Sequence, residues 1–245
     1  MRAWRSFPLL QDRHPILVVP PEFNRNSSTV ISLMSPEDSG CWLLDRMRKQ
    51  IGLESYANKR LLDFGCGVRF SQAIINRKLS IGDYIGVDVC LPMIEFLQKK
   101  VRDDRFSYIF LDAYHAMYNP HGSPLTPNWS LPITQDADVV CMFSVITHQY
   151  PNDSLSIFSI LRRHINAAGQ LFFTCFLDES IFDFEDRSPE RNGGRCFYNP
   201  QFLTDIVQRC GWRVVTRACG EGPLIGDSFV LQPDRASPPH RESYR

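Results

Sequence analysis

The strongest constraint on this chain of 245 residues is a regular alternation of short apolar runs with helix-like segments from residue 60 onward. The seven runs are RLLDF, YIGVD, FSYIFLD, ADVVCMF, QLFFTCF, WRVVT and SFVLQ. Such an alternation is typical of a parallel sheet covered by helices, and strands that are apolar nearly throughout are buried on both faces. We therefore predict a Rossmann-like, doubly wound α/β fold. Its mostly parallel sheet should have seven strands, with an antiparallel edge strand formed late in the chain.

The two ends of the chain lack this regularity. Residues 1–34 mix proline, asparagine and serine without periodicity, and the last dozen residues are charged and rich in proline. We expect an N-terminal arm over residues 1–34, one domain over residues 35–232 and a flexible tail over residues 233–245. The domain should open with a helix, because Ser35 is a suitable N-cap and Gly52 a suitable stop.

Two long connections interrupt the pattern. Residues 113–136 carry four prolines, and residues 178–198 are rich in charge and glycine. Connections of this length in a compact domain are usually functional or mobile. Between them, a helix is predicted whose N-cap lies near Asn152 or Asp153, with Ile165 on its apolar face.

Composition excludes several classes of function. The chain has 27 Lys+Arg and 27 Asp+Glu, with no dense basic run, so a nucleic acid is not the expected partner. No apolar stretch reaches the roughly eighteen residues of a membrane span, and charge and proline interrupt the first residues before a signal region could form. The 8 cysteines lie far apart with no Cys-x-x-Cys, which argues against a zinc site. We expect a cytoplasmic protein with no membrane partner and no metal; the sequence leaves its oligomeric state open.

Polar residues and glycines follow the first three apolar runs. The first run contains Asp63 and is followed by Gly65 and Gly67, where a chain can turn sharply and approach a ligand closely. The second ends in Asp88, 21 residues after Gly67, a distance that suits hydrogen bonds to ribose hydroxyls. The third ends in Asp112. In open α/β sheets, ligands bind at the carboxyl ends of the strands, so these residues predict one site.

Each of these signals has an ordinary alternative. Gly65 and Gly67 alone suit a simple strand-to-helix turn, and Asp88 or Asp112 alone suits a helix cap. Their order and spacing together favour a nucleotide-type site. A dinucleotide fingerprint would place glycine where Phe70 stands, and no Gly-Lys-Ser/Thr follows the turn as a P-loop requires. A nucleoside without a diphosphate is the ligand that fits better.

These segments resemble the class I S-adenosylmethionine-dependent methyltransferases. LLDFGCGVRF is similar to the first motif of that family, IGVDV to the second, FLDAY to the third and ADVVCMFSVITH to the fourth. The narrower likeness is to bacterial small-molecule and sugar methyltransferases, which share a YNP-x-G segment, here Tyr118 to Gly122. The resemblance covers residues 60–177 well and the two ends loosely.

The resemblance implies S-adenosyl-L-methionine as cofactor and assigns residues to it. It places Asp63, Gly65 and Gly67 on the methionine side, Asp88 at the ribose and Asp112 by the adenine. Phe143 and Ser144 would lie near the transferred methyl group.

The sequence departs from the family pattern at Arg69, where a third glycine is usual, and at Ala167-Ala168, where Pro-Gly is usual. A guanidinium beside the sulfonium is electrostatically unfavourable unless it points outward.

His148 is the candidate catalytic residue. It follows the fourth run, and an imidazole with an ordinary pKa near 6.5 can accept the proton of an attacking hydroxyl at neutral pH. The alternative is a loop histidine bonded to the backbone. Two functions remain open: methyl transfer to a small hydroxylated or sugar-like acceptor, or a catalytically silent binding module of the same fold. A nucleic-acid acceptor is disfavoured, because family members that methylate base amino groups carry an Asn/Asp-Pro-Pro-aromatic turn that is absent after Phe143.

Overall fold

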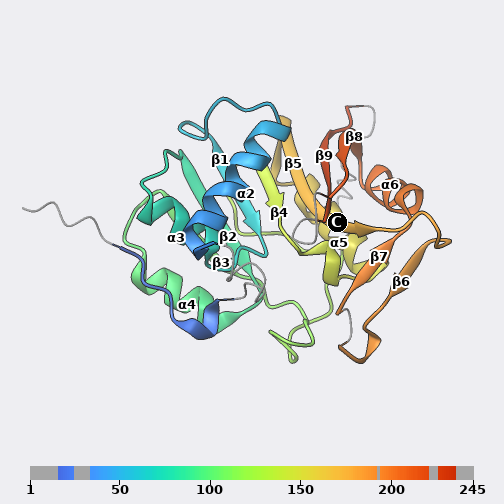
Figure 1. Ribbon diagram of the computed structural model, residues 1–245, viewed down its shortest axis with the longest axis horizontal. Coiled ribbons are helices and arrows are strands. Elements are labelled where there is room, and N and C mark those ends of the chain that lie inside the picture. Colours follow the sequence, from blue (N-terminus) through green and yellow to red (C-terminus); the bar gives the residue numbers. More distant parts are fainter. Residues whose placement is uncertain (1–15, 25–33, 192–193, 221–225, 236–245) are drawn as a thin grey trace, which may run out of the picture.

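A computed structural model describes residues 16–24, 34–191, 194–220 and 226–235 (Figure 1). The helical elements in these ranges are η1 (Pro21–Phe23), α2 (Pro36–Gln50), α3 (Arg69–Asn76), α4 (Leu91–Lys100), η2 (Ile146–His148), α5 (Pro151–Arg162), η3 (Pro189–Arg191) and α6 (Pro200–Arg209). The strands are β1 (Arg60–Phe64), β2 (Asp83–Asp88), β3 (Phe106–Phe110), β4 (Ala137–Met142), β5 (Ile165–Leu177), β6 (Phe184–Asp186), β7 (Cys196–Tyr198), β8 (Trp212–Ala218) and β9 (Asp227–Pro233).

These strands form one mixed sheet whose parallel part confirms the predicted fold class. The strand order is β3-β2-β1-β4-β5-β7-β6, and β9 pairs with β5 and β8. Strands β1 to β5 pair in parallel, whereas β9 runs antiparallel to both of its neighbours. The late antiparallel strand is therefore confirmed.

The prediction of seven strands was too low, because the described residues form nine. The two additional strands, β6 and β7, lie in the segment 178–198 that was expected to be a connection. Each has three residues, too few for an alternation of polar and apolar residues to show. Their pairing is also nonlocal, since β7 extends the sheet beside Phe176 and Leu177 at the end of β5.

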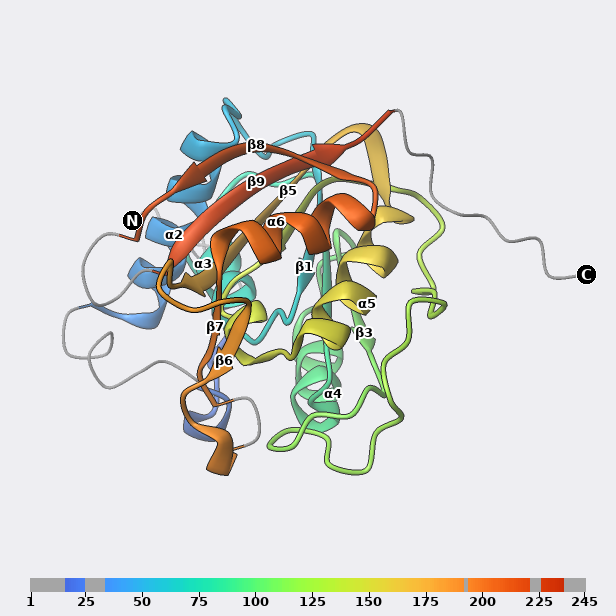
Figure 2. The same ribbon diagram turned by 90° about the vertical axis from the view of Figure 1, so that its right-hand side faces the viewer.

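Helices cover both faces of the sheet (Figures 1 and 2). Successive residues of β1 point to opposite faces: Leu61 packs with residues of α2, α3 and α4, and Leu62 packs with residues of α5 and α6. Both side chains are fully buried. This two-sided burial explains why the strands read as continuous apolar runs.

The first helix of the domain was predicted correctly, but the start of α5 was not. At α2, the Ser35 hydroxyl oxygen accepts a hydrogen bond from the Asp38 N–H at 3.1 Å. At α5, the N-cap is Tyr150, with no side-chain capping bond, in place of Asn152 or Asp153. Ile165 belongs to β5 and not to the preceding helix, since α5 ends at Arg162.

The described part of the predicted arm, residues 16–24, packs against the domain. Leu17 is buried and exchanges two hydrogen bonds with the Asn76 side chain on α3. The rest of the predicted tail beyond residue 235 lies outside the described residues.

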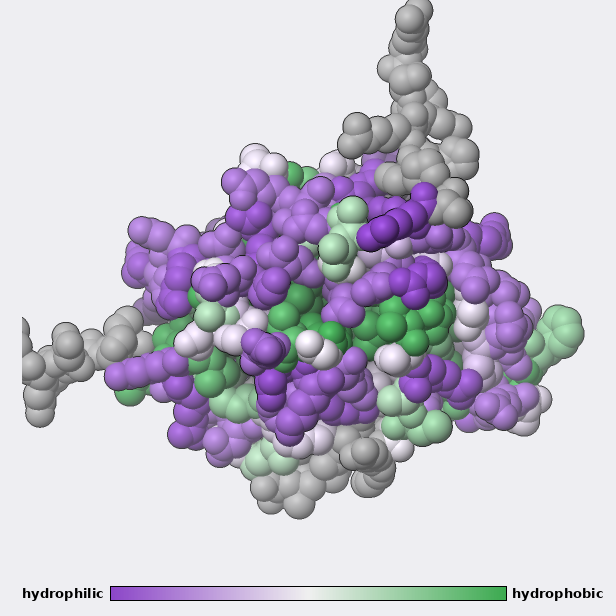
Figure 3. Space-filling view, turned by 90° about the horizontal axis from the view of Figure 1, so that it is seen from above, coloured by the Kyte–Doolittle hydropathy of each residue, from purple (hydrophilic) through white to green (hydrophobic). Residues whose placement is uncertain are grey.

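Seen from above, the surface is mainly hydrophilic, with apolar residues gathered in a central band (Figure 3). Within the described residues, no helix combines the length and the apolarity needed to cross a membrane.

Candidate active site

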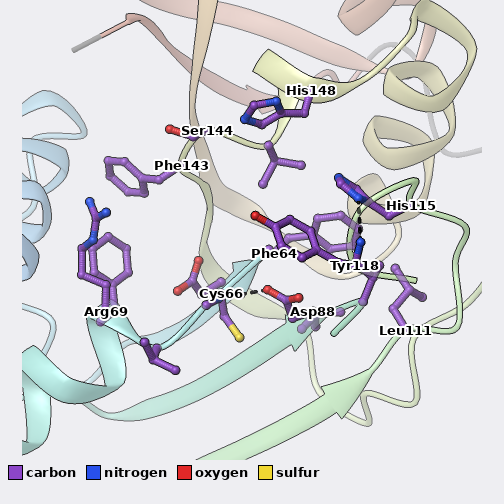
Figure 4. A pocket seen from close by; sticks show the side chains of 18 of the residues that line it. Phe64, Cys66, Arg69, Asp88, Leu111, His115, Tyr118, Phe143, Ser144 and His148 are labelled. Atoms are coloured by element: carbon purple, nitrogen blue, oxygen red, sulfur yellow. Dashed lines mark hydrogen bonds between the residues drawn. The ribbon is translucent and has the colours of Figure 1, made fainter. Parts of the chain in front are cut away.

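A cavity of about 490 Å³ opens at the carboxyl ends of β1, β2 and β4. Its volume lies within the roughly 300–1,000 Å³ that is usual for small-molecule sites. Of the residues predicted to form a site, it brings together Asp63, Gly65, Gly67, Asp88, Phe143, Ser144 and His148, which all line it. Figure 4 shows Asp88, Phe143, Ser144 and His148 around the cavity.

The turn after β1 has a backbone conformation that requires glycine. Gly65 and Gly67 have φ angles of +76° and +52°, which residues with a Cβ atom adopt at a cost. A Cβ at Gly65 would lie 2.5 Å from Val145 Cγ2, whereas a Cβ at Gly67 would meet no atom within 4 Å. The turn therefore packs against the β4 loop at Gly65 and leaves open space over Gly67 on the cavity side.

Asp88 is fixed to this turn. Its Oδ2 accepts a hydrogen bond from Gly67 N–H and its Oδ1 from Cys90 N–H, both at 3.0 Å. The side chain is only 3% exposed. These two backbone donors fix the orientation of the carboxylate, which lines the cavity beside the glycine turn.

Asp63 lies deeper, under the same turn. It accepts a 2.6 Å hydrogen bond from the Tyr84 hydroxyl and a 3.4 Å one from the Cys141 thiol. Burial, which outweighs these bonds, raises the pKa of Asp63 to about 7. Asp63 therefore holds its proton more tightly than an exposed aspartate does.

Arg69 lines the cavity at the first position of α3. Its side chain is half-buried and extends beside Phe143, at the opposite side of the cavity from Leu111 (Figure 4). Burial lowers the pKa of the Arg69 guanidinium, and the charge of Asp63 opposes that effect. Arg69 is therefore part of the cavity wall and not a fully exposed side chain, and the cavity of about 490 Å³ is present with Arg69 in place.

The turn after β4 carries a strained residue. Ser144 has φ +56°, and its N–H donates a 2.8 Å hydrogen bond to Thr174 Oγ1 on β5. Phe143 packs edge-on against Phe70, with ring centroids 5.0 Å apart. Non-glycine residues with positive φ cost roughly 1–3 kcal/mol and concentrate at functional sites.

Polar side chains from three further segments also line the cavity. His148 is exposed at the end of η2, and Tyr118 stacks on His115 with centroids 4.8 Å apart (Figure 4). Asp153 also lines the cavity, from the first turn of α5. It is half-buried, burial raises its pKa, and in the described residues its carboxylate has no hydrogen bond or ion pair.

Asp112 is the one predicted site residue that the structure places elsewhere. Its side chain is exposed, is not part of the cavity wall, and accepts a 3.0 Å hydrogen bond from Asn119 Nδ2. Leu111 and Ala113 line the cavity instead, because neighbouring side chains of an extended segment point in opposite directions. Asn119 belongs to the YNP-x-G segment, and its side chain also donates to the Ala113 carbonyl, so it ties this part of the 113–136 connection to the residues just after β3.

Several other wall residues could not be recognised from the sequence. Val19, Phe23 and Asn24 come from the arm, and Arg46 comes from α2. The arm lacks periodicity, and Arg46 stands on a helix like any surface arginine, so only the tertiary structure reveals them. Within the described residues, no group of three or more His, Cys, Asp or Glu could hold a metal ion.

Comparisons with known proteins agree with this geometry. Residues 42–217, well over half of the chain, match the family model described as a methyltransferase domain. The glycopeptide N-methyltransferase MtfA is similar in structure, with TM-score 0.56 and 10% identity over 88% of this chain and 99% of that chain. A SAM-dependent methyltransferase from Leishmania major has TM-score 0.58 and 16% identity, over 84% and 77% of the two chains. One from Clostridium acetobutylicum has TM-score 0.53 and 9% identity, over 84% and 94%.

The residues of this cavity fit an adenosyl group. Open space over Gly67 admits close approach, Asp88 offers acceptors to a ribose diol, and Val89 and Leu111 supply an apolar wall for a base. The family match, the sheet order and this cavity together identify the protein: the chain belongs to the methyltransferase-domain family, whose methyl donor is S-adenosylmethionine.

Proposed function

We propose that this protein transfers a methyl group from S-adenosylmethionine to a small hydroxylated or sugar-like acceptor. The observation that carries the proposal is the convergence on one cavity of the Gly65–Gly67 turn, Asp88 and His148. S-adenosylmethionine supplies a methyl group on a sulfonium, which an oxygen nucleophile displaces in line. What remains for the protein is to align the reactants, exclude water and remove a proton.

Three groups of the donor end hold the cofactor in this proposal. Asp88 accepts hydrogen bonds from the ribose hydroxyls, because its carboxylate lines the cavity and is fixed beside the glycine turn. The Gly67 backbone lies against the sugar and sulfur, and Leu111 lies against the adenine. Asp112 takes no part, since its carboxylate lies outside the cavity.

His148 is the base in this proposal. Its imidazole stands on the exposed wall, on the same side of the cavity as Ser144 (Figure 4). A neutral ring nitrogen accepts the acceptor's hydroxyl proton as the new O–C bond forms, a contribution of roughly a hundred- to ten-thousand-fold.

Asp153 supports a neutral or cationic acceptor over an acidic one. A half-buried carboxylate without a partner is costly, and a hydroxyl or ammonium of the acceptor would offset that cost. An acceptor that carries its own carboxylate would add repulsion at the same wall.

The test is product formation from a fractionated pool. Cell metabolites are separated by charge, each fraction is incubated with S-adenosylmethionine and the protein, and S-adenosylhomocysteine is quantified. We expect product above background from neutral or cationic hydroxylated fractions and not from the acidic fraction. Binding of the donor by calorimetry without product from any fraction would instead support the binding-module alternative. Product from the acidic fraction alone would contradict the proposed acceptor class.

A further inference from the structure

One buried hydroxyl group joins the two segments that carry His148 and Asp153. Tyr198, the last residue of β7, is fully buried. Its hydroxyl oxygen lies 2.7 Å from the Gln149 carbonyl oxygen and 2.8 Å from Ser154 Oγ. Gln149 directly follows His148, and Ser154 directly follows Asp153. Tyr198 is therefore bonded to a neighbour of each of these two side chains.

The directions of the two hydrogen bonds follow from the groups present. A carbonyl oxygen can only accept, so the Tyr198 hydroxyl donates its one proton to Gln149. The Ser154 hydroxyl is then the donor of the second bond, to the Tyr198 oxygen. Ser154 and Tyr198 are both fully buried, and a buried hydroxyl that loses its partner is costly. Removal of the Tyr198 hydroxyl breaks both bonds at once.

The backbone is fixed on both sides of the His148 side chain. On one side, the His148 N–H donates to the Val145 carbonyl at 3.0 Å, which closes the turn of η2. The backbone then becomes extended at Gln149, with φ −114° and ψ 141°. On this other side, the Tyr198 hydroxyl binds the Gln149 carbonyl.

Tyr198 belongs to a hairpin formed by β6 and β7. The two strands pair antiparallel, and β7 also pairs in parallel with the end of β5. From β6, Asp186 Oδ2 accepts a 2.9 Å hydrogen bond from the Tyr150 hydroxyl, and Phe184 packs on Tyr150 with ring centroids 5.4 Å apart. None of the described residues of this hairpin lines the cavity. Its contacts therefore act on residues beside the cavity and not on a ligand directly.

We infer that Tyr198 is a positioning residue that sets the placement of the His148 imidazole relative to the Asp153 carboxylate. This inference rests on the proposed function, in which His148 removes the proton of an acceptor that Asp153 binds. A shift of about 1 Å at a reacting group can cost about a hundredfold in rate, so a bond that fixes the backbone beside His148 affects turnover. Donor binding is not affected, because Gly67 and Asp88 lie on other segments.

Tyr198→Phe removes the hydroxyl and keeps the ring. We expect turnover with the acceptor fraction to fall by about 10- to 100-fold. The S-adenosylhomocysteine affinity, measured by calorimetry, should change by less than about threefold.

A second measurement needs neither donor nor acceptor. Proton–nitrogen NMR spectra of the full-length protein report the imidazole groups of its 6 histidines. The His148 signals are assigned by their loss in His148→Gln. We expect these signals to shift in Tyr198→Phe, because the backbone that carries the imidazole is no longer held at Gln149.

Tyr56→Phe is the matched control. The Tyr56 hydroxyl is also buried and also donates to a backbone carbonyl, that of Leu44 at 2.9 Å. It lies on the other face of the sheet and does not line the cavity. Both variants should have a lower melting temperature, because each loses a buried hydrogen bond. Tyr56→Phe should leave turnover and the His148 signals unchanged.

Equal effects of Tyr198→Phe and Tyr56→Phe on turnover, or unshifted His148 signals in Tyr198→Phe, would overturn the inference and leave the proposed function standing. A loss of S-adenosylhomocysteine affinity in Tyr198→Phe as large as the loss of turnover would also overturn it, because the substitution would then act on the whole cavity. If the unmodified protein forms no product with any fraction, the proposed function fails, and the His148 signals still decide whether Tyr198 positions that side chain.

Discussion

The two ends of the cavity are built in different ways. In the proposed function, one end of the cavity takes the methyl donor and the other the acceptor. The donor end consists of backbone turns at strand ends and of buried acids with fixed partners: Asp88 bonds to two backbone N–H groups and Asp63 to Tyr84 and Cys141. The acceptor end consists of side chains on connections and on the first turn of α5. His148 is exposed there, and the Asp153 carboxylate has no hydrogen bond or ion pair within the described residues.

This difference indicates that the donor end is oriented before its ligand binds, whereas the acceptor end selects among ligands. A donor end whose polar groups are already oriented binds its ligand without rearrangement. At the acceptor end, the Asp153 carboxylate has no hydrogen bond or ion pair within the described residues and is open to a molecule that donates to it. Changes at the donor end should therefore affect stability and binding together, whereas changes at the acceptor end should affect turnover alone.

His148→Ala should give the largest effect on turnover. Removal of a general base costs roughly a hundred- to ten-thousand-fold in rate. Because the side chain is exposed and lies at the acceptor end, we expect the melting temperature and the S-adenosylhomocysteine affinity to stay nearly unchanged. Steady-state kinetics with the acceptor fraction measure turnover, and calorimetry measures the affinity.

His148→Gln is the control, because it keeps a polar side chain without a base. Unchanged turnover in both variants would return His148 to the role of a loop histidine.

Gly65→Ala should lower both the stability of the protein and its affinity for S-adenosylhomocysteine. The positive φ costs about 1–2 kcal/mol for a residue with a Cβ, and the contact with Val145 adds roughly 1–3 kcal/mol. Gly67→Ala carries only the first cost, because no protein atom lies near its Cβ. Denaturant unfolding should rank Gly65→Ala as the less stable variant, and calorimetry should show weaker S-adenosylhomocysteine binding in both. Equal stability would mean that the Val145 contact relaxes without cost.

The donor end was also the part that the sequence predicted best. Gly65, Gly67 and Asp88 follow buried strands at fixed spacing, so secondary structure alone brings them to one edge of the sheet. Asp112 lies outside the cavity because a strand end fixes position along the chain, whereas a one-residue difference decides which way a side chain points. The acceptor end was only partly accessible to prediction. His148 follows a strand, but whether Tyr118 and Asp153 line the same cavity depends on how the 113–136 connection folds, which no periodicity encodes.

Asp63→Asn tests the buried acid at the donor end. Burial raises the pKa of Asp63 to about 7, above its value in the unfolded chain, so the folded state binds the proton more tightly. This contribution to stability is fully present below the unfolded pKa and is lost as pH rises through about 7. Between pH 5 and pH 8, the free energy of unfolding should fall by about 3 kcal/mol more in the unmodified protein than in Asp63→Asn. Urea unfolding across this range measures the difference, and parallel pH profiles would show that Asp63 stays ionised.

Thr174→Val is the smallest perturbation, and it acts where the two ends meet. Thr174 Oγ1 accepts the Ser144 N–H, which holds a residue with φ +56° between Phe143 and the acceptor wall. Valine has nearly the same shape, and water can reach the exposed Ser144, so the expected loss is about 1 kcal/mol in unfolding free energy.

Ser144→Gly removes the conformational strain and should recover part of that loss in the double variant, since the two residues share one interaction. If Thr174 only packs in β5, the two substitutions will be additive. If it positions the turn, the double-mutant cycle will show coupling, and turnover will fall several-fold in Thr174→Val while S-adenosylhomocysteine affinity stays close to that of the unmodified protein.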